Sequence, residues 1–231
     1  MKTLGMIAGL GPESTIDYYR LIIASYRERT RDDSYPPMII NSLDLQKIIR
    51  LMEAQDYSTV AEFMVAEIEK LAAAGADFGL ISSNTPHIVF DEIGSRAAIP
   101  LISIVEATCE YASTQGLTKL GLFGSGFTMK ASFYPEIFAR KGMAVIVPEP
   151  GEQTFIHQKY MDELVKGAFL PETRAELMKI VERMKKEHGI QGLILGGTEL
   201  PLLLREATGC GIPFLDTARI HVNAAVQEML L

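Results

Sequence analysis

The stretch KKEHGIQGLILGGTEL, residues 185–200, contains the pattern that decides the fold. It reads as the end of a helix, a glycine, a short apolar strand and a polar turn. Three further stretches repeat this order as far as the strand: LAAAGADFGLI (71–81), ASTQGLTKLGLF (112–123) and FARKGMAVIVP (138–148). In each, we expect the glycine to adopt the left-handed conformation that closes a helix. Helices that alternate with apolar strands predict an α/β protein with mostly parallel sheet covered by helices on both faces.

Three landmarks of the first half of the chain return in the second half at nearly the same offset. KTLGMIAG (2–9) is similar to TKLGLFGS (118–125), LISSNT (80–85) to ILGGTE (194–199), and IPLI (99–102) to IPFL (212–215). General similarity between βα units would not keep three landmarks in step, so we predict two related α/β lobes. We expect residues 1–100, joined by 210–231, to form the first lobe and residues 101–209 to form the second. The active site is expected between them.

Composition narrows the class of protein. With 48% hydrophobic and 22% charged residues, the sequence is typical of a folded globular protein and holds no apolar run long enough to span a membrane. The net charge of −7 argues against a nucleic-acid partner, which requires a basic surface. Only two cysteines occur, Cys109 and Cys210, which favours a reducing compartment. We expect a cytoplasmic location, and we interpret the N-terminal MKTLGMIAGLGPEST as a strand followed by a helix rather than a signal peptide.

Small polar residues gather where the predicted strands end. Ligands of open parallel sheets bind beyond these carboxyl ends, where helix N-termini present free N–H groups. Such side chains also begin helices: Asn84 or Thr85 fits an N-cap, Thr198 can cap the next helix, and Glu199 can complement its dipole. Helix capping does not account for four small polar residues in a row, so the sequence predicts a site for a small anion such as a carboxylate. The stretches concerned are GLGPEST (9–15), SSNTPH (82–87), GSGFT (124–128) and GGTEL (196–200). GLGPEST is only a partial dinucleotide-binding fingerprint, because Ser14 replaces its third glycine.

LISSNTPH, LILGGTEL and GLGPEST resemble, in order and spacing, the conserved stretches of the aspartate/glutamate racemase family, which include a CNT-A-H-like and a GCTE-like motif. The resemblance runs the length of the chain. It implies an isomerase of amino-acid metabolism that uses no pyridoxal phosphate and no metal, and relatives imply a homodimer. In the family, one cysteine thiolate removes the α-proton of the substrate and a second cysteine protonates the opposite face. Here the two cysteine positions are Ser83 and Gly197, so the acid and base groups differ from those of the family.

The resemblance also assigns substrate contacts. Asn84 and Thr85 match the pair that receives the α-carboxylate, and Lys166 matches a lysine near the side-chain carboxylate, although a solvated lysine at a helix end explains it equally well. His87 and Glu199 are expected to support the site. An arginine of some members has no clear counterpart, and Gln46, Lys47 and Arg50 are nearby candidates. The remaining predicted contacts are Gly11, Ser125, Thr128 and Thr198.

Three functions remain open at this point. The first is a racemase acting on a small acidic amino acid, with activity altered or lost through the changes at Ser83 and Gly197. The second is an isomerase, lyase or decarboxylase of a small carboxylic acid that needs fewer proton-transfer groups. The third is a carboxylate-binding relative without catalysis. Cys109 and Cys210 lie outside both motifs and are predicted to be structural.

Overall fold

The chain folds into two compact units. The structure, a computed structural model, describes residues 1–31, 33–204 and 210–231. The first unit comprises residues 1–107 and 218–231, and the second comprises residues 108–217. These bounds differ by several residues from the division predicted at 100/101 and 209/210, and residue 209 lies outside the described ranges. The difference follows from strand pairing, because residues 101–102 join the first sheet and residues 214–216 join the second.

The first unit is built on a parallel sheet with the strand order β2-β1-β3-β4. In the register, Leu4 lies opposite both Met38 and Phe78. Each residue of the two central strands, β1 and β3, is buried, as expected for strands covered on both faces. The strands are β1 (Leu4–Ala8), β2 (Met38–Ser42), β3 (Phe78–Ile81) and β4 (Leu101–Ile102).

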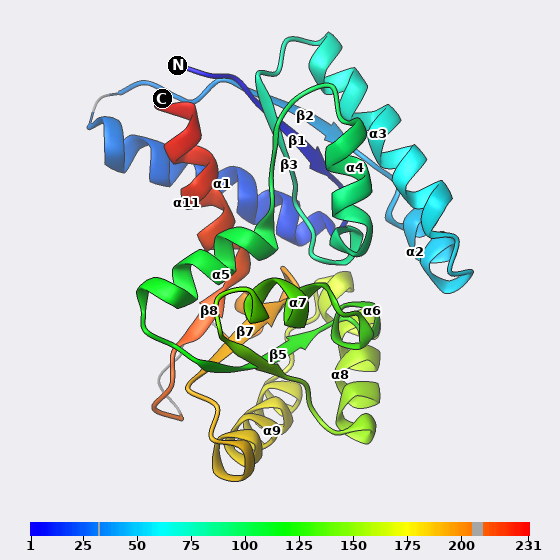
Figure 1. Cartoon of the computed structure of the whole chain (residues 1–231), viewed down its shortest axis with the longest axis vertical. Coiled ribbons are helices and arrows are strands. Elements are labelled where there is room, and N and C mark those ends of the chain that lie inside the picture. Colours follow the sequence, from blue (N-terminus) through cyan, green and yellow to red (C-terminus); the bar gives the residue numbers. More distant parts are fainter. Residues whose placement is uncertain (32, 205–209) are drawn as a thin grey trace. The chain divides into compact units, whose positions relative to one another are not determined.

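Helices cover both faces of this sheet (Figure 1). On one face, α1 and α11 lie side by side, and their apolar residues, Tyr18, Ile22 and Val226 among them, form one buried core with β1 and β3. On the other face lie α3 and α4. The helical elements of the unit are α1 (Pro12–Thr30), α2 (Leu45–Glu53), α3 (Tyr57–Ala73), the 3-10 helix η1 (Thr85–Val89), α4 (Phe90–Arg96), the first turn of α5 (Ile104–Thr114) and α11 (Thr217–Met229).

The second unit repeats the arrangement of the first. Its parallel sheet has the order β6-β5-β7-β8, so β5, β7 and β8 take the places of β1, β3 and β4. These are the three strand pairs that carry the repeated sequence landmarks. The structure thus confirms the predicted α/β class with two lobes of mostly parallel sheet. The strands are β5 (Lys119–Gly124), β6 (Ala144–Ile146), β7 (Gly192–Gly196) and β8 (Phe214–Asp216).

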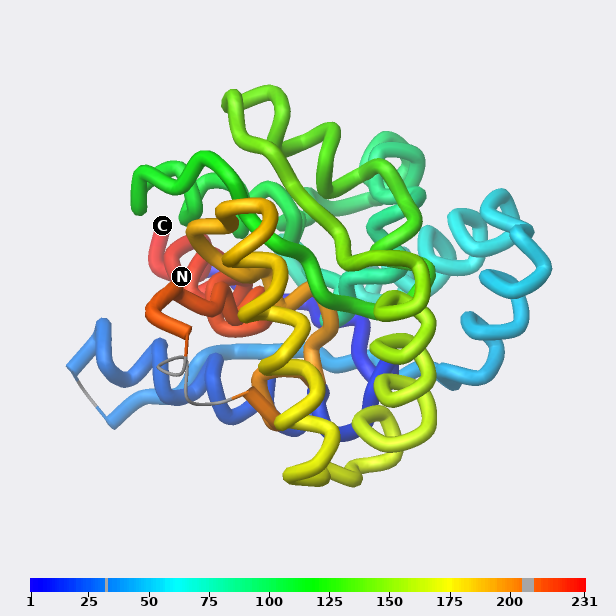
Figure 2. The backbone as a smooth tube through the Cα atoms, turned by 90° about the horizontal axis from the view of Figure 1, so that it is seen from below, coloured from blue at the N-terminus to red at the C-terminus, as the bar shows by residue number. Residues whose placement is uncertain are grey.

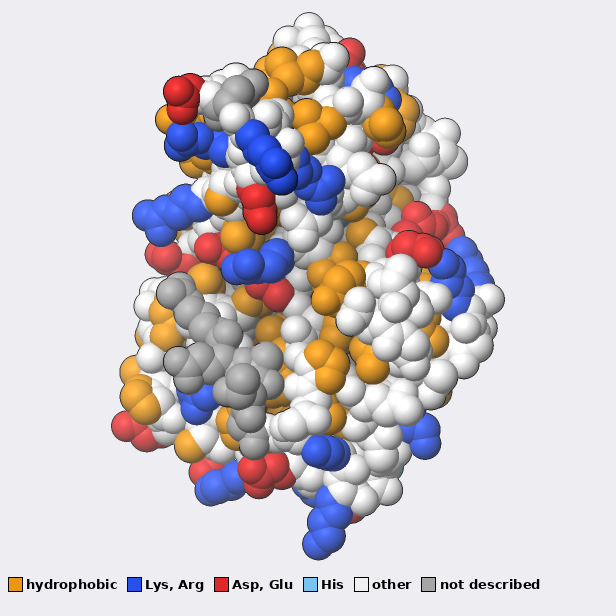
Figure 3. Space-filling view, turned by 90° about the vertical axis from the view of Figure 1, so that its left-hand side faces the viewer, with side chains coloured by type: hydrophobic (Ala, Val, Ile, Leu, Met, Phe, Trp, Pro, Cys, Tyr) orange, Lys and Arg blue, Asp and Glu red, His pale blue; other side chains and the backbone are white. Residues whose placement is uncertain are grey.

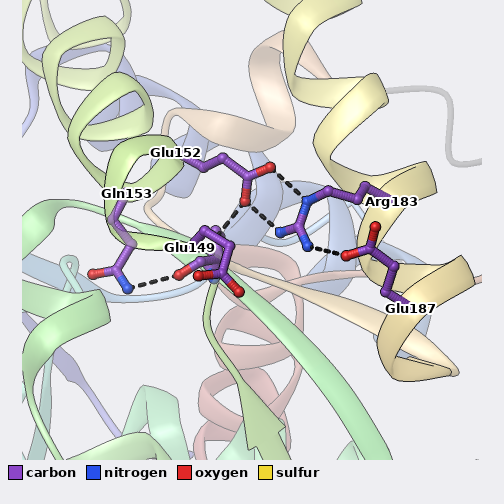
Figure 4. A network of polar contacts seen from close by, with 6 residues as sticks. Glu149, Glu152, Gln153, Arg183 and Glu187 are labelled. Atoms are coloured by element: carbon purple, nitrogen blue, oxygen red, sulfur yellow. Dashed lines mark hydrogen bonds and ion pairs between the residues drawn. The ribbon is translucent and has the colours of Figure 1, made fainter.

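Two long helices of the second unit, α8 and α9, pack next to one another (Figure 2). Arg183 of α9 donates from Nε to Glu152 Oε1 of α8 at 2.7 Å and from Nη1 to Glu187 Oε2 at 2.7 Å. Glu152 in turn accepts the backbone N–H of Glu149 at 3.0 Å, which closes the first turn of α8 (Figure 4). This network fixes the start of α8 against α9. The helical elements are α6 (Gly126–Lys130), α7 (Phe133–Ala139), α8 (Pro150–Asp162), η2 (Leu164–Lys166), α9 (Pro171–His188) and α10 (Leu200–Leu203).

The helix-closing glycines behave as the sequence predicts. Gly75, Gly116, Gly142 and Gly189 all have positive φ angles, between 66° and 97°. Among the described residues, none of the helices combines the length and the apolar character needed to cross a membrane. On the face drawn in Figure 3, basic side chains are interspersed with acidic ones and do not form one continuous patch.

Candidate functional site

The turn after β1 is held tightly by its own backbone. Gly9 has φ 77°, and a Cβ atom there would lie 2.4 Å from the carbonyl oxygen of Leu43, so only glycine fits. Its N–H donates to Thr15 Oγ1 at 2.9 Å. Gly11, with φ 147°, precedes Pro12 at the first position of α1, as its sequence predicts. The Gly11 carbonyl accepts the Thr15 and Ser14 hydroxyls at 2.9 and 3.0 Å, so these hydroxyls serve the turn.

The polar residues after β3 have different environments. Ser82 is fully buried, and its hydroxyl donates to the Ile7 carbonyl at 2.9 Å, which ties the end of β3 to β1. Asn84 is also buried and forms the N-cap residue of η1, without a capping hydrogen bond from its side chain. Ser83 and Thr85, in contrast, are partly exposed. Of this stretch, Ser83 and Thr85 are therefore the hydroxyl-bearing residues with exposed surface.

His87 is held in one neutral form. Its Nδ1 lies 3.0 Å from the Ser83 carbonyl oxygen and its Nε2 accepts the Ile104 N–H at 3.2 Å. Nδ1 must then carry the proton, because Nε2 is an acceptor. Burial, and then the nearby His221, lower the pKa of His87 to about 3. With both ring nitrogens engaged with backbone, His87 positions the end of β3 and the start of α5, and its contact with Ser83 is to the carbonyl group.

His221 is a second buried histidine of the first unit. Its Nδ1 lies 3.0 Å from the hydroxyl of Tyr18 and its Nε2 lies 2.9 Å from the Ile102 carbonyl oxygen. Burial lowers its pKa to about 4. The two histidines therefore contact the backbone at the end of β4 and at the start of α5. No spacing in the sequence indicates this, since His221 lies on the last helix and its partners lie on α1 and β4.

In the second unit, Ser125 and Thr128 hydrogen-bond to each other at the end of β5. The Ser125 hydroxyl accepts the Thr128 N–H at 3.2 Å and lies 3.2 Å from the Thr128 hydroxyl, and both residues are buried. Ser125 is thus the N-cap of the short helix α6. His157 of α8 reaches the same turn, because its Nδ1 accepts the N–H of Gly126 at 3.0 Å.

Gly197, at the end of β7, lies directly against an aromatic ring. A Cβ atom built on Gly197 would lie 2.5 Å from Cε2 and 3.1 Å from the hydroxyl oxygen of Tyr160, which comes from α8. The phenol therefore occupies the space that a side chain at residue 197 would take. Sequence reasoning missed Tyr160, because nothing in FIHQKYMD links it to a strand that follows much later in the chain.

Tyr160 belongs to a cluster of polar groups with Thr198 and Glu199. Its hydroxyl donates to Glu199 Oε2, and the Thr198 hydroxyl lies 3.2 Å from the same oxygen. Glu199 is only 1% exposed, and burial followed by the charge of Glu199 raises the pKa of Tyr160 well above its usual value. Glu199 is also the N-cap residue of α10, a place that the sequence assigned to Thr198. The buried carboxylate thus serves more than the helix dipole.

Lys166 has a solvated environment in the structure. Its side chain is 65% exposed and its Nζ lies 3.4 Å from Asp162 Oδ1. Among the candidates for the missing arginine, Lys47 places its Nζ 3.5 Å from the centroid of the Phe63 ring, and Arg50 donates to the Gln46 carbonyl at 3.2 Å.

Both cysteines of the chain are buried free thiols. The Cys109 thiol lies 3.7 Å from the Ile137 carbonyl oxygen. Burial raises the pKa of the Cys210 thiol above its ordinary value. A raised pKa leaves little reactive thiolate at neutral pH.

The model of the family described as Asp/Glu/Hydantoin racemase matches residues 7–225. Among characterised sequences, the chain is 26% identical to the broad specificity amino-acid racemase RacX of Bacillus subtilis (strain 168), over 98% of each chain. Among solved structures, a presumed Asp/Glu racemase from Yersinia pestis is 31% identical with a TM-score of 0.90, over 100% of both chains. An aspartate racemase homologue from Pyrococcus horikoshii OT3 is 30% identical with a TM-score of 0.86, again over 100% of both.

Proposed function

Because this chain belongs to the Asp/Glu/Hydantoin racemase family, we propose that it is an isomerase that inverts the α-carbon of a small amino acid, with aspartate and glutamate as the first candidates. The observation that carries the proposal is the match over residues 7–225, which includes the polar turns after β3 and β7. Similarity to a broad specificity amino-acid racemase supports tests with neutral amino acids as well.

The proposed substrate contacts come from the polar turns at the strand ends. Asn84 and Thr85 bind the α-carboxylate, because helix N-termini with hydroxyl and amide groups suit an anion. The partial exposure of Thr85 supports this role. His87 acts by holding the turn that carries Ser83, as its two backbone contacts support. The other proposed substrate contacts are Gly11, Ser125, Thr128, Lys166 and Thr198.

The proposed reaction removes the α-proton and returns a proton without pyridoxal phosphate or a metal. Ser83 and Gly197 occupy the positions of the two family cysteines. A serine hydroxyl is a weak acid that needs an activating neighbour, and glycine carries no proton at all. We therefore expect the rate to differ from that of a two-cysteine enzyme.

Gly197 also favours a second candidate function. A lyase, decarboxylase or other isomerase of a small carboxylic acid needs fewer proton-transfer groups than inversion does, and a binding protein needs none.

We further propose that the protein is a cytoplasmic homodimer. Analytical ultracentrifugation of the purified chain will test the dimer through the mass of the assembly.

Exchange in deuterium oxide separates these functions. The purified protein is incubated with each enantiomer of aspartate, glutamate and a set of neutral amino acids, followed by proton NMR and chiral chromatography. Solvent deuterium at the α-carbon together with the opposite enantiomer supports the racemase. Deuterium without inversion supports one-sided chemistry, whereas binding measured by calorimetry without exchange supports the non-catalytic relative and contradicts the proposal.

A further inference from the structure

We propose that Tyr160 is the catalytic acid of the second unit, and that Glu199 is the residue that positions its hydroxyl. The proposal rests on the proposed function, because it assigns the proton donor for one face of the α-carbon. In the step, the O–H bond of Tyr160 breaks as a C–H bond forms at the substrate carbanion. The resulting tyrosinate then regains a proton from water.

The first argument is the place that the phenol occupies. The family resemblance puts a proton-transferring side chain at residue 197, and this chain has glycine there. The Tyr160 ring fills the same space, since a Cβ on Gly197 would lie 2.5 Å from Cε2 and 3.1 Å from the hydroxyl oxygen. Glycine at residue 197 leaves the space in which the phenol from α8 lies at the end of β7.

The second argument is that glycine at 197 is not required by the backbone. Gly197 does not have the positive φ that favours glycine, unlike Gly9. The packed ring is therefore the structural reason that excludes a side chain here, and the ring brings a hydroxyl with it.

The third argument is the hydrogen bonding behind the phenol. The Tyr160 hydroxyl donates to Oε2 of Glu199, whose side chain is buried, whereas Tyr160 as a whole residue is partly exposed. Thr198 shares the same carboxylate oxygen at 3.2 Å. The hydroxyl proton points to Glu199 in this arrangement, so the hydroxyl turns toward the substrate when it donates, and the neighbouring negative charge keeps the phenol protonated at neutral pH. A carbanion is far more basic than a phenolate, so the phenol can still donate to it.

The test compares Tyr160→Phe with the wild type and with Tyr111→Phe, a matched change on an exposed residue of α5. We expect Tyr160→Phe to slow the formation of deuterated, inverted product by about 100-fold or more, with KM changed less than about threefold. Tyr111→Phe should match the wild type. Glu199→Gln, which keeps an acceptor for the hydroxyl but removes the charge, should lower kcat with little change in KM.

The outcomes distinguish this proposal from the proposed function. If the wild type inverts an amino acid and folded Tyr160→Phe does so within about threefold of its rate, the role of Tyr160 is wrong and the racemase assignment stands. If the wild type neither exchanges nor inverts any amino acid tested, both are wrong. If Tyr160→Phe fails to fold, 3-fluorotyrosine at position 160 provides the second test, because it makes the phenol more acidic at little steric cost. An unchanged rate of proton delivery would then overturn the proposal.

Discussion

At the scale of single residues, Gly197 and Tyr160 form one steric unit. The ring leaves no room for a Cβ at residue 197, although the backbone there would accept one. A cysteine introduced at this position must therefore displace the phenol, whereas Ser83 is partly exposed. Residues 83 and 197 therefore differ in the room that they leave for a cysteine side chain.

A double-mutant cycle measures the contact between these two residues. We expect Gly197→Cys to lower the free energy of unfolding by about 1–3 kcal/mol, because it overpacks the space beside Tyr160. In a Tyr160→Ala background the same change should cost clearly less. Urea denaturation of the four proteins gives the coupling energy, and equal costs in both backgrounds would show that the ring does not exclude the side chain.

Thr85 carries the prediction for carboxylate binding. Thr85→Val keeps the shape of the side chain and removes its hydroxyl, so we expect the affinity for an amino-acid substrate to fall by about 1–3 kcal/mol. Calorimetry measures the change. Thr30→Val is the matched control, because the Thr30 hydroxyl donates to the backbone carbonyl of Tyr26 in the same helix, at 3.1 Å. Equal affinities of the Thr85 and Thr30 variants would remove Thr85 from the site.

At the scale of elements, helix α8 brings His157 and Tyr160 to the strand ends of the second unit. Its position depends on the contact of Arg183 with Glu152, whose side chains are only 24% and 23% exposed. Such a two-pronged, partly buried pair is worth more than a surface ion pair. The order of the strands in the sheet then determines which strand-end turns the side chains of α8 can contact.

Removal of this contact should loosen α8. We expect Arg183→Met to lower the free energy of unfolding by about 1–2 kcal/mol. Lys179→Met on the same helix is the control, because the side chains of Lys179 and Glu176 are 70% and 52% exposed and such pairs contribute less than about 0.5 kcal/mol. Chemical denaturation measures the free energy of unfolding of both variants. A similar decrease in the two would show that the Arg183 network has no special role.

At the scale of the whole molecule, two units with the same strand order have acquired different polar centres. The first unit holds two neutral histidines, His87 and His221, against the backbone at the end of β4 and the start of α5. The second unit has a phenol and a carboxylate at the end of β7. Acid should therefore affect the two units in different ways, and the histidines give the first unit a measurable dependence on pH.

Stability should fall as the pH falls below about 6.5. The folded pKa values of His87 and His221 are about 3 and about 4, against 6.5 as the ordinary value. Between these limits the unfolded chain binds more protons than the folded chain, so the stabilisation is fully present above pH 6.5 and is lost as the pH falls toward about 4 for His221 and about 3 for His87. We expect a loss of about 2–4 kcal/mol between pH 6.5 and 5. The lowered carboxyl pKa values of Glu67 and Glu163 act below 4.5, outside this window.

Urea denaturation across this range, with wild type and His221→Gln, tests the assignment. The variant lacks one buried imidazole, so its stability should depend less steeply on pH even if it is less stable throughout. Equal slopes for the two proteins would show that His221 does not carry the effect.

Much of the fold could be predicted from local patterns. The helix–glycine–strand stretches and the three repeated landmarks depend on residues close in sequence, and they led to parallel sheets in two similar lobes. The bounds of the two units depend on more than local patterns, because the pairing of β4 with β3 and of β8 with β7 is a contact between distant segments. The polar turns at Ser83 and Thr198 were predicted for the same local reason, since each follows an apolar strand.

The sequence by itself determined the parallel α/β class, the repeat of the two lobes and the polar stretches at the strand ends, because backbone geometry and apolar periodicity act between neighbouring residues. Only the tertiary structure placed the Tyr160 phenol in the space beside Gly197 and the His221 ring between Tyr18 and Ile102. Those contacts join residues far apart in the chain. They arise from side-chain packing between elements, which no local pattern encodes.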